Sequence, residues 1–414
     1  MKKLILSASS IGAFKSCPVR FKNAYVYGIR PVEDKESQRV GTSWHLLLET
    51  ASLVPGSDCV GCENEAAIGN PSPCEDCIIC AGTGKVPSDI MEAVTRVLNS
   101  AYEGIEFADP TVKEIERVTL LHALAGYRWH YGEQQEPAVA TEQYFSLPLL
   151  NPQTGHPVPD VFIKGRIDKL IEIASGIAVK EHKSTSKSID PDSTYWGHLN
   201  LDVQTTMYIY AARRMQILDL ASVGLLPGDD GNSLINTVKY DVYHKPTIRP
   251  KKLTQAESKK FVGNGSHLGV GEYCGQKFKI ADNIDADSDP DGLYVNDYEA
   301  TIEPGAKEGT FTIRETPDMF GARLLKDITE RPEFYFRCVE LIRTDAELKA
   351  FEQELYDICK DMQFKIRSGR FWHNEKQCEA TFRCDYIEQC YNRIQVDQDH
   401  VPDGFKCIFR KDGE

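Results

Sequence analysis

The chain has 414 residues, 41% hydrophobic and 27% charged, which is typical of a soluble protein with one large domain or two ordinary ones. The formal net charge of −14 excludes a protein coated with basic surface, but a positive cleft in an acidic body is still compatible with a nucleic-acid partner. No apolar run is long enough for a membrane span. The apolar patch in the opening MKKLILSASSIGAF is too short for a signal peptide, so we expect a cytoplasmic protein with no membrane partner.

The first third of the chain predicts helices interrupted by one insert. Residues 7–28 read as a helix with a serine cap followed by aromatic-rich sequence, and residues 40–54 as a second helix. Residues 58–85 are rich in Cys, Gly and Pro and have too few apolar residues to fold without help. Helical periodicity returns over residues 88–131.

The middle of the chain predicts the sheet. Three strands separated by turn signals follow one another, a strong helix covers residues 198–218, and a further strand leads into a basic loop. Residues 253–310 are polar and are expected to form an irregular excursion from the core, and two helices follow at 317–329 and 345–368. There are no internal repeats. The order of elements predicts an α/β sheet core with insertions.

Acidic and basic residues stand at the ends of two of these strands. Asp168 ends an apolar run, Glu181 follows after twelve residues, and Lys183 comes two positions later. Two carboxylates at neighbouring strand ends can hold Mg²⁺, and a lysine on the same strand face could position an attacking water or balance charge on a phosphate. Taken alone, this short pattern fits a solvated surface hairpin at least as well.

Two helices supply further candidates at one-turn spacing. His45 and Glu49 lie one turn apart in GTSWHLLLE, and Gln204 and Tyr208 have the same spacing in the helix after the strands. A lone helical histidine is usually a satisfied structural residue, and Tyr208 could equally be a core aromatic. The order of all these pieces carries more information than any one of them.

That order resembles the PD-(D/E)xK nuclease superfamily, and most closely its RecB/AddB-like branch, which includes the CRISPR-adaptation exonucleases. The resemblance covers residues 7–49, 142–208 and 378–391, but not the insertions between them. It implies a restriction-endonuclease-like mixed sheet core flanked by helices. It also implies hydrolysis of DNA phosphodiester bonds with Mg²⁺ or Mn²⁺.

By the resemblance, each candidate takes a role. The metal would be bound by His45, Asp168 and Glu181, with the backbone carbonyl of His182 as a further ligand. Lys183 would be the catalytic lysine. The helix pair Gln204 and Tyr208 would contact DNA or support the site, and Glu142 would be either an accessory acid or a solvated strand residue.

Thirteen cysteines are many for a reducing compartment, and their clustering favours metal binding. In the tail, Cys378, Cys384 and Cys390 are separated by five residues in each gap, and a cubane iron–sulfur cluster needs a fourth thiolate, for which Cys17 is the candidate. RecB/AddB-like nucleases carry such a 4Fe–4S cluster, although their first gap usually has two residues. Zinc in the same pocket and four unrelated buried thiols are the alternatives.

The insert carries a second cysteine group. Two C-x2-C knuckles separated by a short loop are a strong Zn²⁺ signature, because tetrahedral zinc takes four thiolates. Two matched knuckles would use Cys59, Cys62, Cys77 and Cys80, and Cys74 could replace one of them. Zinc would then order a segment that has almost no core. The alternative is that the insert binds no metal.

Three weaker signals remain. Asp287, Asp289 and Asp291 are spaced like the start of a calcium loop, but Tyr298 stands where the bidentate Glu belongs, which favours a solvated acidic loop. Two basic stretches with aromatic neighbours could contact phosphates and unpaired bases, or could be solvated faces. Their residues are Lys245, Arg249, Lys251 and Lys252 in the first stretch and Arg367, Arg370 and Trp372 in the second.

The sequence therefore predicts a stand-alone DNA exonuclease, since it contains no G-x4-GK-[ST] motor loop. A nonspecific endonuclease and a non-catalytic DNA-binding or assembly subunit using the zinc insert are the rivals. The resemblance suggests recombination, repair, phage DNA processing or CRISPR adaptation and does not choose among them. The partners it implies are DNA, as single strands or duplex ends, and a recombination or adaptation protein. We expect N-terminal core helices (1–55), a zinc-knuckle insert (56–86), the nuclease core (87–252), an irregular insertion (253–312), and C-terminal helices with the iron–sulfur tail (313–414).

Overall fold

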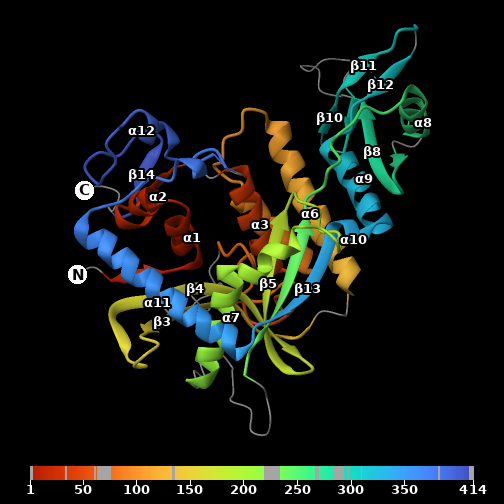
Figure 1. The fold of residues 1–414 in the computed structure, drawn as a ribbon. Coiled ribbons are helices and arrows are strands. Elements are labelled where there is room, and N and C mark those ends of the chain that lie inside the picture. Colours follow the sequence, from red (N-terminus) through yellow and green to blue (C-terminus); the bar gives the residue numbers. More distant parts are fainter. Residues whose placement is uncertain are drawn as a thin grey trace.

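The computed structural model describes residues 3–32, 35–59, 62, 76–132, 136–218, 234–265, 270–282, 293–296, 298–308, 310–380 and 383–409. A central sheet lies between two groups of helices, and a smaller lobe of strands extends away from one side (Figure 1). Among the described helices, none is both long and apolar enough to cross a membrane.

The central sheet is mixed, as predicted. Its order is β1-β4-β5-β6-β13, with β3 paired to β4 as well. The β3–β4–β5 meander is antiparallel, whereas β5 and β6 run parallel because a helix connects them. The strands are β1 (Leu4–Leu6), β3 (Ala138–Leu150), β4 (Pro157–Ile173), β5 (Gly176–Thr185), β6 (Thr237–His244) and β13 (Phe336–Ile342).

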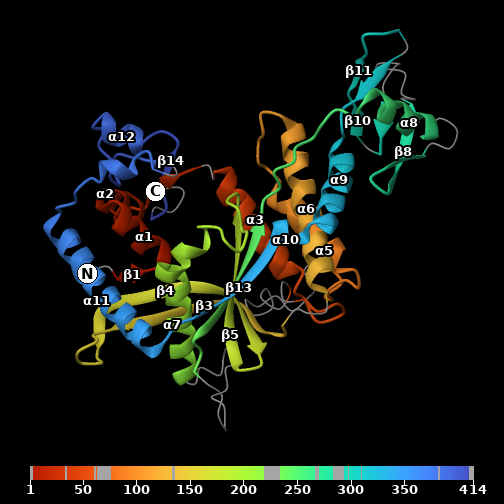
Figure 2. The ribbon, with the colours of Figure 1, turned by 45° about the vertical axis from the view of Figure 1, so that its right-hand side comes forward.

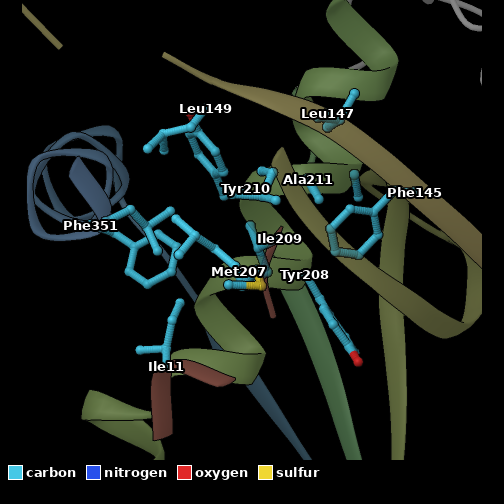
Figure 3. Packing of buried hydrophobic residues seen from close by; sticks show 14 of the residues in the cluster. Ile11, Phe145, Leu147, Leu149, Met207, Tyr208, Ile209, Tyr210, Ala211 and Phe351 are labelled. Carbon is cyan, nitrogen blue, oxygen red and sulfur yellow. The ribbon is translucent and has the colours of Figure 1, made fainter. Parts of the chain in front are cut away.

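One face of the sheet is covered by α1 (Ala8–Ser16), α7 (Val203–Ile217) and α11 (Asp345–Ser368). α7 is buried on most sides because it packs against the sheet, α1 and α11. Its first turn is capped by Asp202, which accepts a hydrogen bond of 2.7 Å from the backbone of Thr205. Figure 3 shows the resulting core, in which residues from β3 and α7 meet Ile11 and Phe351.

The other face carries α3 (Glu36–Thr50), α5 (Ile90–Ala101), α6 (Pro110–Tyr131) and α9 (Pro317–Glu330). α5 buries Ile90, Val94 and Val97 on one side, which is the helical period that the sequence showed. Trp44 of α3 stacks on Tyr243 of β6 with ring centroids 4.5 Å apart. These aromatic contacts fix α3 relative to the sheet.

The excursion is more regular than the sequence indicated. Instead of an irregular insertion it contains α8 and strands β7–β12 (Figure 2). Its small core includes Phe261, Phe278, Val295 and Ile313. These apolar residues are too widely spaced along a polar sequence to show a period of their own. The elements are α8 (Gln255–Gly265), β7 (Val270–Tyr273), β8 (Gln276–Asp282), β9 (Leu293–Val295), β10 (Tyr298–Ala300), β11 (Ile302–Pro304) and β12 (Phe311–Ile313).

The two ends of the described chain lie together. β2 pairs with β14, and the Tyr386 hydroxyl donates a 2.6 Å hydrogen bond to the carbonyl of Ile29. The predicted first helix is broken at Cys17, because extended backbone at Cys17 separates α1 from α2 and Pro18 begins the new helix. The remaining elements are α2 (Pro18–Phe21), η1 (Lys22–Val26), β2 (Ile29–Pro31), η3 (Trp196–Leu201), α10 (Pro332–Tyr335), η5 (Glu375–Gln377), α12 (Ile387–Tyr391) and β14 (Phe405–Cys407).

Candidate active site and cysteine clusters

The antiparallel register of β4 and β5 brings the two strand acids together. Its pairs run from Ile173–Gly176 to Lys169–Lys180, and Asp168 and Glu181 come immediately after the last pair on their two strands. Residues opposite one another in a sheet share a face, and Lys183 shares it too because side chains alternate along a strand. The pattern that suggested a shared site is therefore a consequence of the hairpin.

Asp168 is held by a helix and by the neighbouring strand. Its Oδ1 lies 3.3 Å from Nδ1 of His45 on α3, and its Oδ2 accepts a 2.8 Å hydrogen bond from the backbone N–H of His182. Burial alone would raise the pKa of Asp168, but the hydrogen bond and charge of His45 lower it to about 2. Conversely, although burial disfavours its charged form, the contact with Asp168 raises the pKa of His45.

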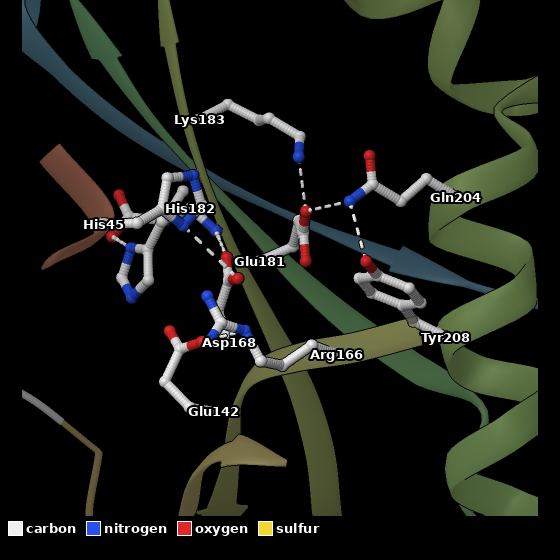
Figure 4. Close-up of polar contacts among 10 residues, drawn as sticks. His45, Glu142, Arg166, Asp168, Glu181, His182, Lys183, Gln204 and Tyr208 are labelled. Atoms are coloured by element: carbon white, nitrogen blue, oxygen red, sulfur yellow. Dashed lines mark hydrogen bonds and ion pairs between the residues drawn. The ribbon is translucent and has the colours of Figure 1, made fainter. Parts of the chain in front are cut away.

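Glu181 is almost fully buried, with 1% of its surface exposed. Its Oε1 accepts hydrogen bonds from the Lys183 ammonium and, at 2.7 Å, from the Gln204 amide (Figure 4). Its Oε2 is buried without a hydrogen-bond partner. Burial raises the pKa of Glu181 to about 7 despite the opposing charge of Lys183. The unpartnered oxygen is an open acceptor beside a cation and a second acid.

The Q-x-x-x-Y helix pair completes this arrangement. The Gln204 amide also donates a 3.0 Å hydrogen bond to the hydroxyl of Tyr208, so it connects Tyr208 to Glu181 (Figure 4). Burial raises the pKa of Tyr208 to about 12, which keeps the phenol protonated. For Lys183, burial opposes the charged form, but Glu181 and Asp168 raise its pKa, which keeps the ammonium charged.

All six side chains predicted for the site therefore meet, although not at the spacing of a closed metal site. Within the part of the chain that is described, a set of three or more ligand atoms lying within 4.8 Å of one another occurs for the insert cysteines and not for His45, Asp168 and Glu181. Lys183 and Gln204 hold Oε1 of Glu181 instead. The side chain of His182 points to the opposite face, and a role for its carbonyl stays a prediction.

Two further acids lie next to this group. Glu142 of β3 forms a 2.6 Å ion pair with Arg166, and burial raises its pKa to about 7 with help from the charges of Glu49 and Asp168. Burial also raises the pKa of Glu49, one helical turn after His45. The accessory position predicted for Glu142 is thus beside the acids (Figure 4).

Asp241 is a residue that the sequence reading missed. It pairs with His182 in the β5–β6 register, and its Oδ2 lies 3.0 Å from Nδ1 of His182 and 2.5 Å from the Tyr127 hydroxyl, which donates to it. Asp241 and Tyr127 thus contact β5 on the face opposite the candidate active site, at His182, the residue between Glu181 and Lys183. A lone acid in the apolar strand TVKYDVYH was the available signal, the same signal that identified Asp168.

Gly165 was missed as well. A Cβ added there would lie 2.6 Å from the Phe145 ring and 3.0 Å from the Tyr208 ring, so a larger residue would displace one of them. The two rings already pack edge to face with centroids 5.9 Å apart. Gly165 therefore allows Tyr208 to lie close to β4, three residues before Asp168.

The insert cysteines converge as the two knuckles predict. Sγ of Cys59 lies 3.7 Å from that of Cys77, Sγ of Cys62 lies 3.4 Å from that of Cys80, and all four sulfurs lie within 4.8 Å of one another. Zn–S bonds of about 2.3 Å in a tetrahedron require sulfurs about 3.8 Å apart. Although burial opposes it, hydrogen bonding from Cys62 and its neighbours lowers the pKa of Cys80 to about 7.

The knuckle is also tied to the protein. The Arg96 side chain of α5 donates hydrogen bonds to the carbonyls of Ile78 at 3.0 Å and Ile79 at 2.7 Å. Val86 and Ile90 are buried beneath it with Ala93. Cys74 lies outside the described residues, so its role as a substitute ligand stays a prediction.

The four terminal cysteines line one small cavity of about 20 Å³, despite their separation in the sequence. Burial and the neighbouring thiols raise the pKa of Cys390 to about 11. Among the described residues these sulfurs do not meet the 4.8 Å spacing that the knuckle sulfurs share. The cysteines are Cys17, Cys378, Cys384 and Cys390.

The basic stretches and the acidic loop are less informative. The backbone N–H of Lys245 bonds the carbonyl of Thr185 at 2.7 Å, which places the start of the first stretch beside the end of β5. Lys252 is engaged in an ion pair with Glu303 of the lobe. Trp372 is 49% exposed at the end of the second stretch. The calcium-like loop (Asp287, Asp289, Asp291) lies outside the described residues.

Comparison with known families gives one match that spans nearly the whole chain. Residues 5–391 match the family model described as the PD-(D/E)XK nuclease superfamily. No curated protein matches the sequence.

Proposed function

Because the chain belongs to the PD-(D/E)XK nuclease superfamily, we propose that it is a metal-dependent DNA exonuclease acting at DNA ends or on single strands. The observation that carries the proposal is the buried, unpartnered Oε2 of Glu181, which lies in one group with Asp168 and Lys183. A buried carboxylate oxygen without a partner is costly unless a ligand satisfies it.

The donor set fits a divalent cation. Two carboxylates and an imidazole are ligands for Mn²⁺, and the carboxylates suit Mg²⁺, so we assign the site to His45, Asp168 and Glu181. When bound, the cation supplies Lewis-acid polarisation of the phosphate and lowers the pKa of a water. The backbone carbonyl of His182 is proposed as a further ligand.

The other residues of the site would orient and balance charge. Lys183 keeps its ammonium protonated, so it would stabilise negative charge on the phosphate and position the attacking water rather than accept a proton. Gln204 fixes the orientation of Glu181 through its 2.7 Å hydrogen bond, and Tyr208 supports Gln204 from the same helix. Exact placement of this kind supplies much of the rate in hydrolytic sites.

The test compares end-labelled single- and double-stranded DNA in the presence of Mg²⁺ or Mn²⁺. Lys183→Ala should reduce cleavage by about 10²–10⁴-fold, whereas the control Lys187→Ala, an exposed lysine on the same segment, should leave it unchanged. Undiminished cleavage by both Lys183→Ala and Asp168→Ala would contradict the assignment.

The choice of exonuclease rests on the resemblance to the RecB/AddB-like branch, and the absence of a G-x4-GK-[ST] motif from the sequence favours a stand-alone enzyme over a motor-nuclease. Linear DNA should be degraded and covalently closed circular DNA of the same sequence should persist. Cleavage of the circle at a comparable rate would favour the nonspecific endonuclease.

We further propose that the two cysteine groups are structural metal centres. A 4Fe–4S cluster on Cys17, Cys378, Cys384 and Cys390 would join the two chain ends, and Zn²⁺ on the knuckles would order the insert. Anaerobically purified protein should be brown, and Cys384→Ser should lose the colour while Cys274→Ser keeps it. A colourless wild-type protein would contradict the cluster, and the absence of bound zinc by elemental analysis would contradict the knuckle.

A further inference from the structure

A separate cavity of about 430 Å³ lies behind the strand that carries Asp168. It is enclosed by α3, the C-terminal part of α6 and β4, and the two helices run side by side over this face of the sheet (Figures 1 and 2). Its volume is that of a small-molecule site. The described residues that line it are Leu48, Ala51, Ser52, Leu124, Tyr127, Arg128, Trp129, Gly132 and Lys169.

The buried cation of this cavity is Lys169. Only 8% of its surface is exposed, and among the described residues its ammonium has neither a hydrogen bond nor an ion pair. Because neighbouring side chains on a strand point to opposite faces, Lys169 points away from the face of Asp168. Its neighbours on this face differ, since Lys180 and Lys239 both form ion pairs with Glu136.

The charge of the cavity is one-sided. Arg128 adds a second cation, and no acidic residue occurs among the described lining residues. The chain as a whole carries a net charge of −14, and the carboxylates that act on Lys169, those of Asp241, Asp168 and Glu142, are not among the described lining residues. Burial of an unpaired ammonium is unfavourable unless an anion satisfies it. The cavity is thus suited to an anionic ligand.

The rest of the lining is apolar and aromatic. The Tyr127 hydroxyl is engaged by Asp241, so the tyrosine offers its ring, and Leu48 and Leu124 add aliphatic surface. Trp129 is 56% exposed, which leaves its indole available for stacking. A ligand that combines an anionic group with a flat ring would satisfy every part of this lining.

We propose that this cavity binds a nucleoside monophosphate, with its phosphate between Lys169 and Arg128 and its base against Trp129. The choice of this class rests on the proposed function, because exonucleolytic hydrolysis releases nucleoside monophosphates. The site lies on the opposite face of the sheet from Glu181 and Lys183, so it can be filled while DNA occupies the active site.

The test is calorimetric titration of the full chain with deoxyadenosine 5′-monophosphate, without added Mg²⁺ or Mn²⁺. One saturable site is expected, with binding weakened about tenfold or more by Lys169→Met and about tenfold by Trp129→Ala. Lys164→Met, which removes a lysine of the same strand outside the cavity, should bind like the wild type. Deoxyadenosine and inorganic phosphate, titrated separately, should each bind at least about tenfold more weakly.

Several results would overturn the proposal. One is a titration that does not saturate at millimolar nucleotide. The others are a Lys169→Met variant that binds the nucleotide as tightly as the wild type does, and inorganic phosphate that binds as tightly as the nucleotide. A loss of binding in Lys183→Ala as large as in Lys169→Met would place the nucleotide in the active site instead. Unchanged melting temperatures of the variants show that they are folded. The proposed nuclease activity is tested separately, by comparing DNA cleavage by the wild type with cleavage by Lys183→Ala.

Discussion

The two faces of the β4–β5 hairpin meet very different surroundings. On the α7 face, Glu181 shares one oxygen between Lys183 and Gln204 and leaves the other buried without a partner. On the α6 face, Asp241 contacts both His182 and Tyr127. Both ring nitrogens of His182 lack a hydrogen bond, although Nδ1 lies 3.0 Å from Asp241. The two carboxylates differ nevertheless, because both oxygens of Asp241 accept hydrogen bonds from tyrosine hydroxyls, whereas Oε2 of Glu181 accepts none.

This difference distinguishes the candidate active site around Glu181 from the structural group around Asp241. A buried carboxylate whose two oxygens both accept hydrogen bonds, such as Asp241, needs no ligand, whereas an open acceptor is stabilised by a ligand that supplies the missing partner. Asp241 can thus hold β5 from the α6 face, and the open oxygen on the α7 face is where we propose that chemistry occurs. On the α6 face, the ammonium of Lys169 has no hydrogen bond or ion pair among the described residues, which is the reason to infer a ligand there.

The largest loss of activity is expected from a substitution that changes only the α7 face. Glu181→Gln should reduce DNA cleavage by about 10³-fold, because it removes a metal-binding charge. Its stability should stay the same or rise, because a buried carboxyl whose pKa is raised to about 7 is unfavourable when ionised. Cleavage rates and urea unfolding at pH 8 measure the two effects. A large loss of stability would show that Glu181 is a structural residue.

The next largest effect, a loss of stability, is expected from a substitution that changes only the α6 face. Asp241→Asn should lower the free energy of unfolding by about 2 kcal/mol, because it removes the charged partner of two buried donors. Cleavage at low temperature should fall much less than in Glu181→Gln. Urea unfolding with the exposed Asp345→Asn as control tests this. If Asp241→Asn and Glu181→Gln lost the same amount of activity and neither lost stability, the two faces would not have different roles.

A smaller effect should follow from disturbing the packing beneath the α7 face. Gly165→Ala would push a methyl group into the Phe145 and Tyr208 rings and so shift the support of Gln204. We expect cleavage to fall about tenfold. Gly197→Ala is the matched control, since a Cβ there meets nothing within 4 Å. Equal activity of the two variants would show that Tyr208 does not position the site.

The smallest effect concerns pH. The pKa of Glu142 is raised to about 7 in the folded protein, mainly by burial, so the folded state keeps a proton that the unfolded chain has lost. Its contribution to stability is present below pH 4.5 and is lost as pH rises towards 7. Glu142→Gln should therefore gain about 1 kcal/mol relative to wild type at pH 8 and nothing at pH 4. A gain of the same size at both pH values would contradict this cause.

Much of the fold could be predicted from periodicity. The three meander strands, α9 and α11 lie where the sequence placed them, because each has a regular apolar pattern and clear end signals. The helix expected from residue 198 begins instead at Val203, because Asp202 caps it after a short 3-10 helix. The lobe around Phe261 and Phe278 was expected to be irregular, since its core is assembled from short strands with few apolar residues. Local patterns cannot reveal a core of that kind.

The side chains of the candidate active site could be predicted from the sequence, but the residues that pack around them could not. Asp168, Glu181 and Lys183 stand out as charged residues in apolar strands, and the spacing of Gln204 and Tyr208 places them on one helix face. The partner of His182 could not be found in this way, because Asp241 lies nearly sixty residues further along and meets it only through parallel pairing.

By itself the sequence determined the α/β class, the strand acids and the knuckle cysteines, because period, capping and ligand spacing are local properties of the chain. Only the tertiary structure decided which oxygen of Glu181 stays open, which acid contacts His182 of β5, and that Lys169 faces a cavity whose described lining contains no acid. Those outcomes depend on how strands and helices distant in sequence pack together, and burial and partner choice arise only from that packing.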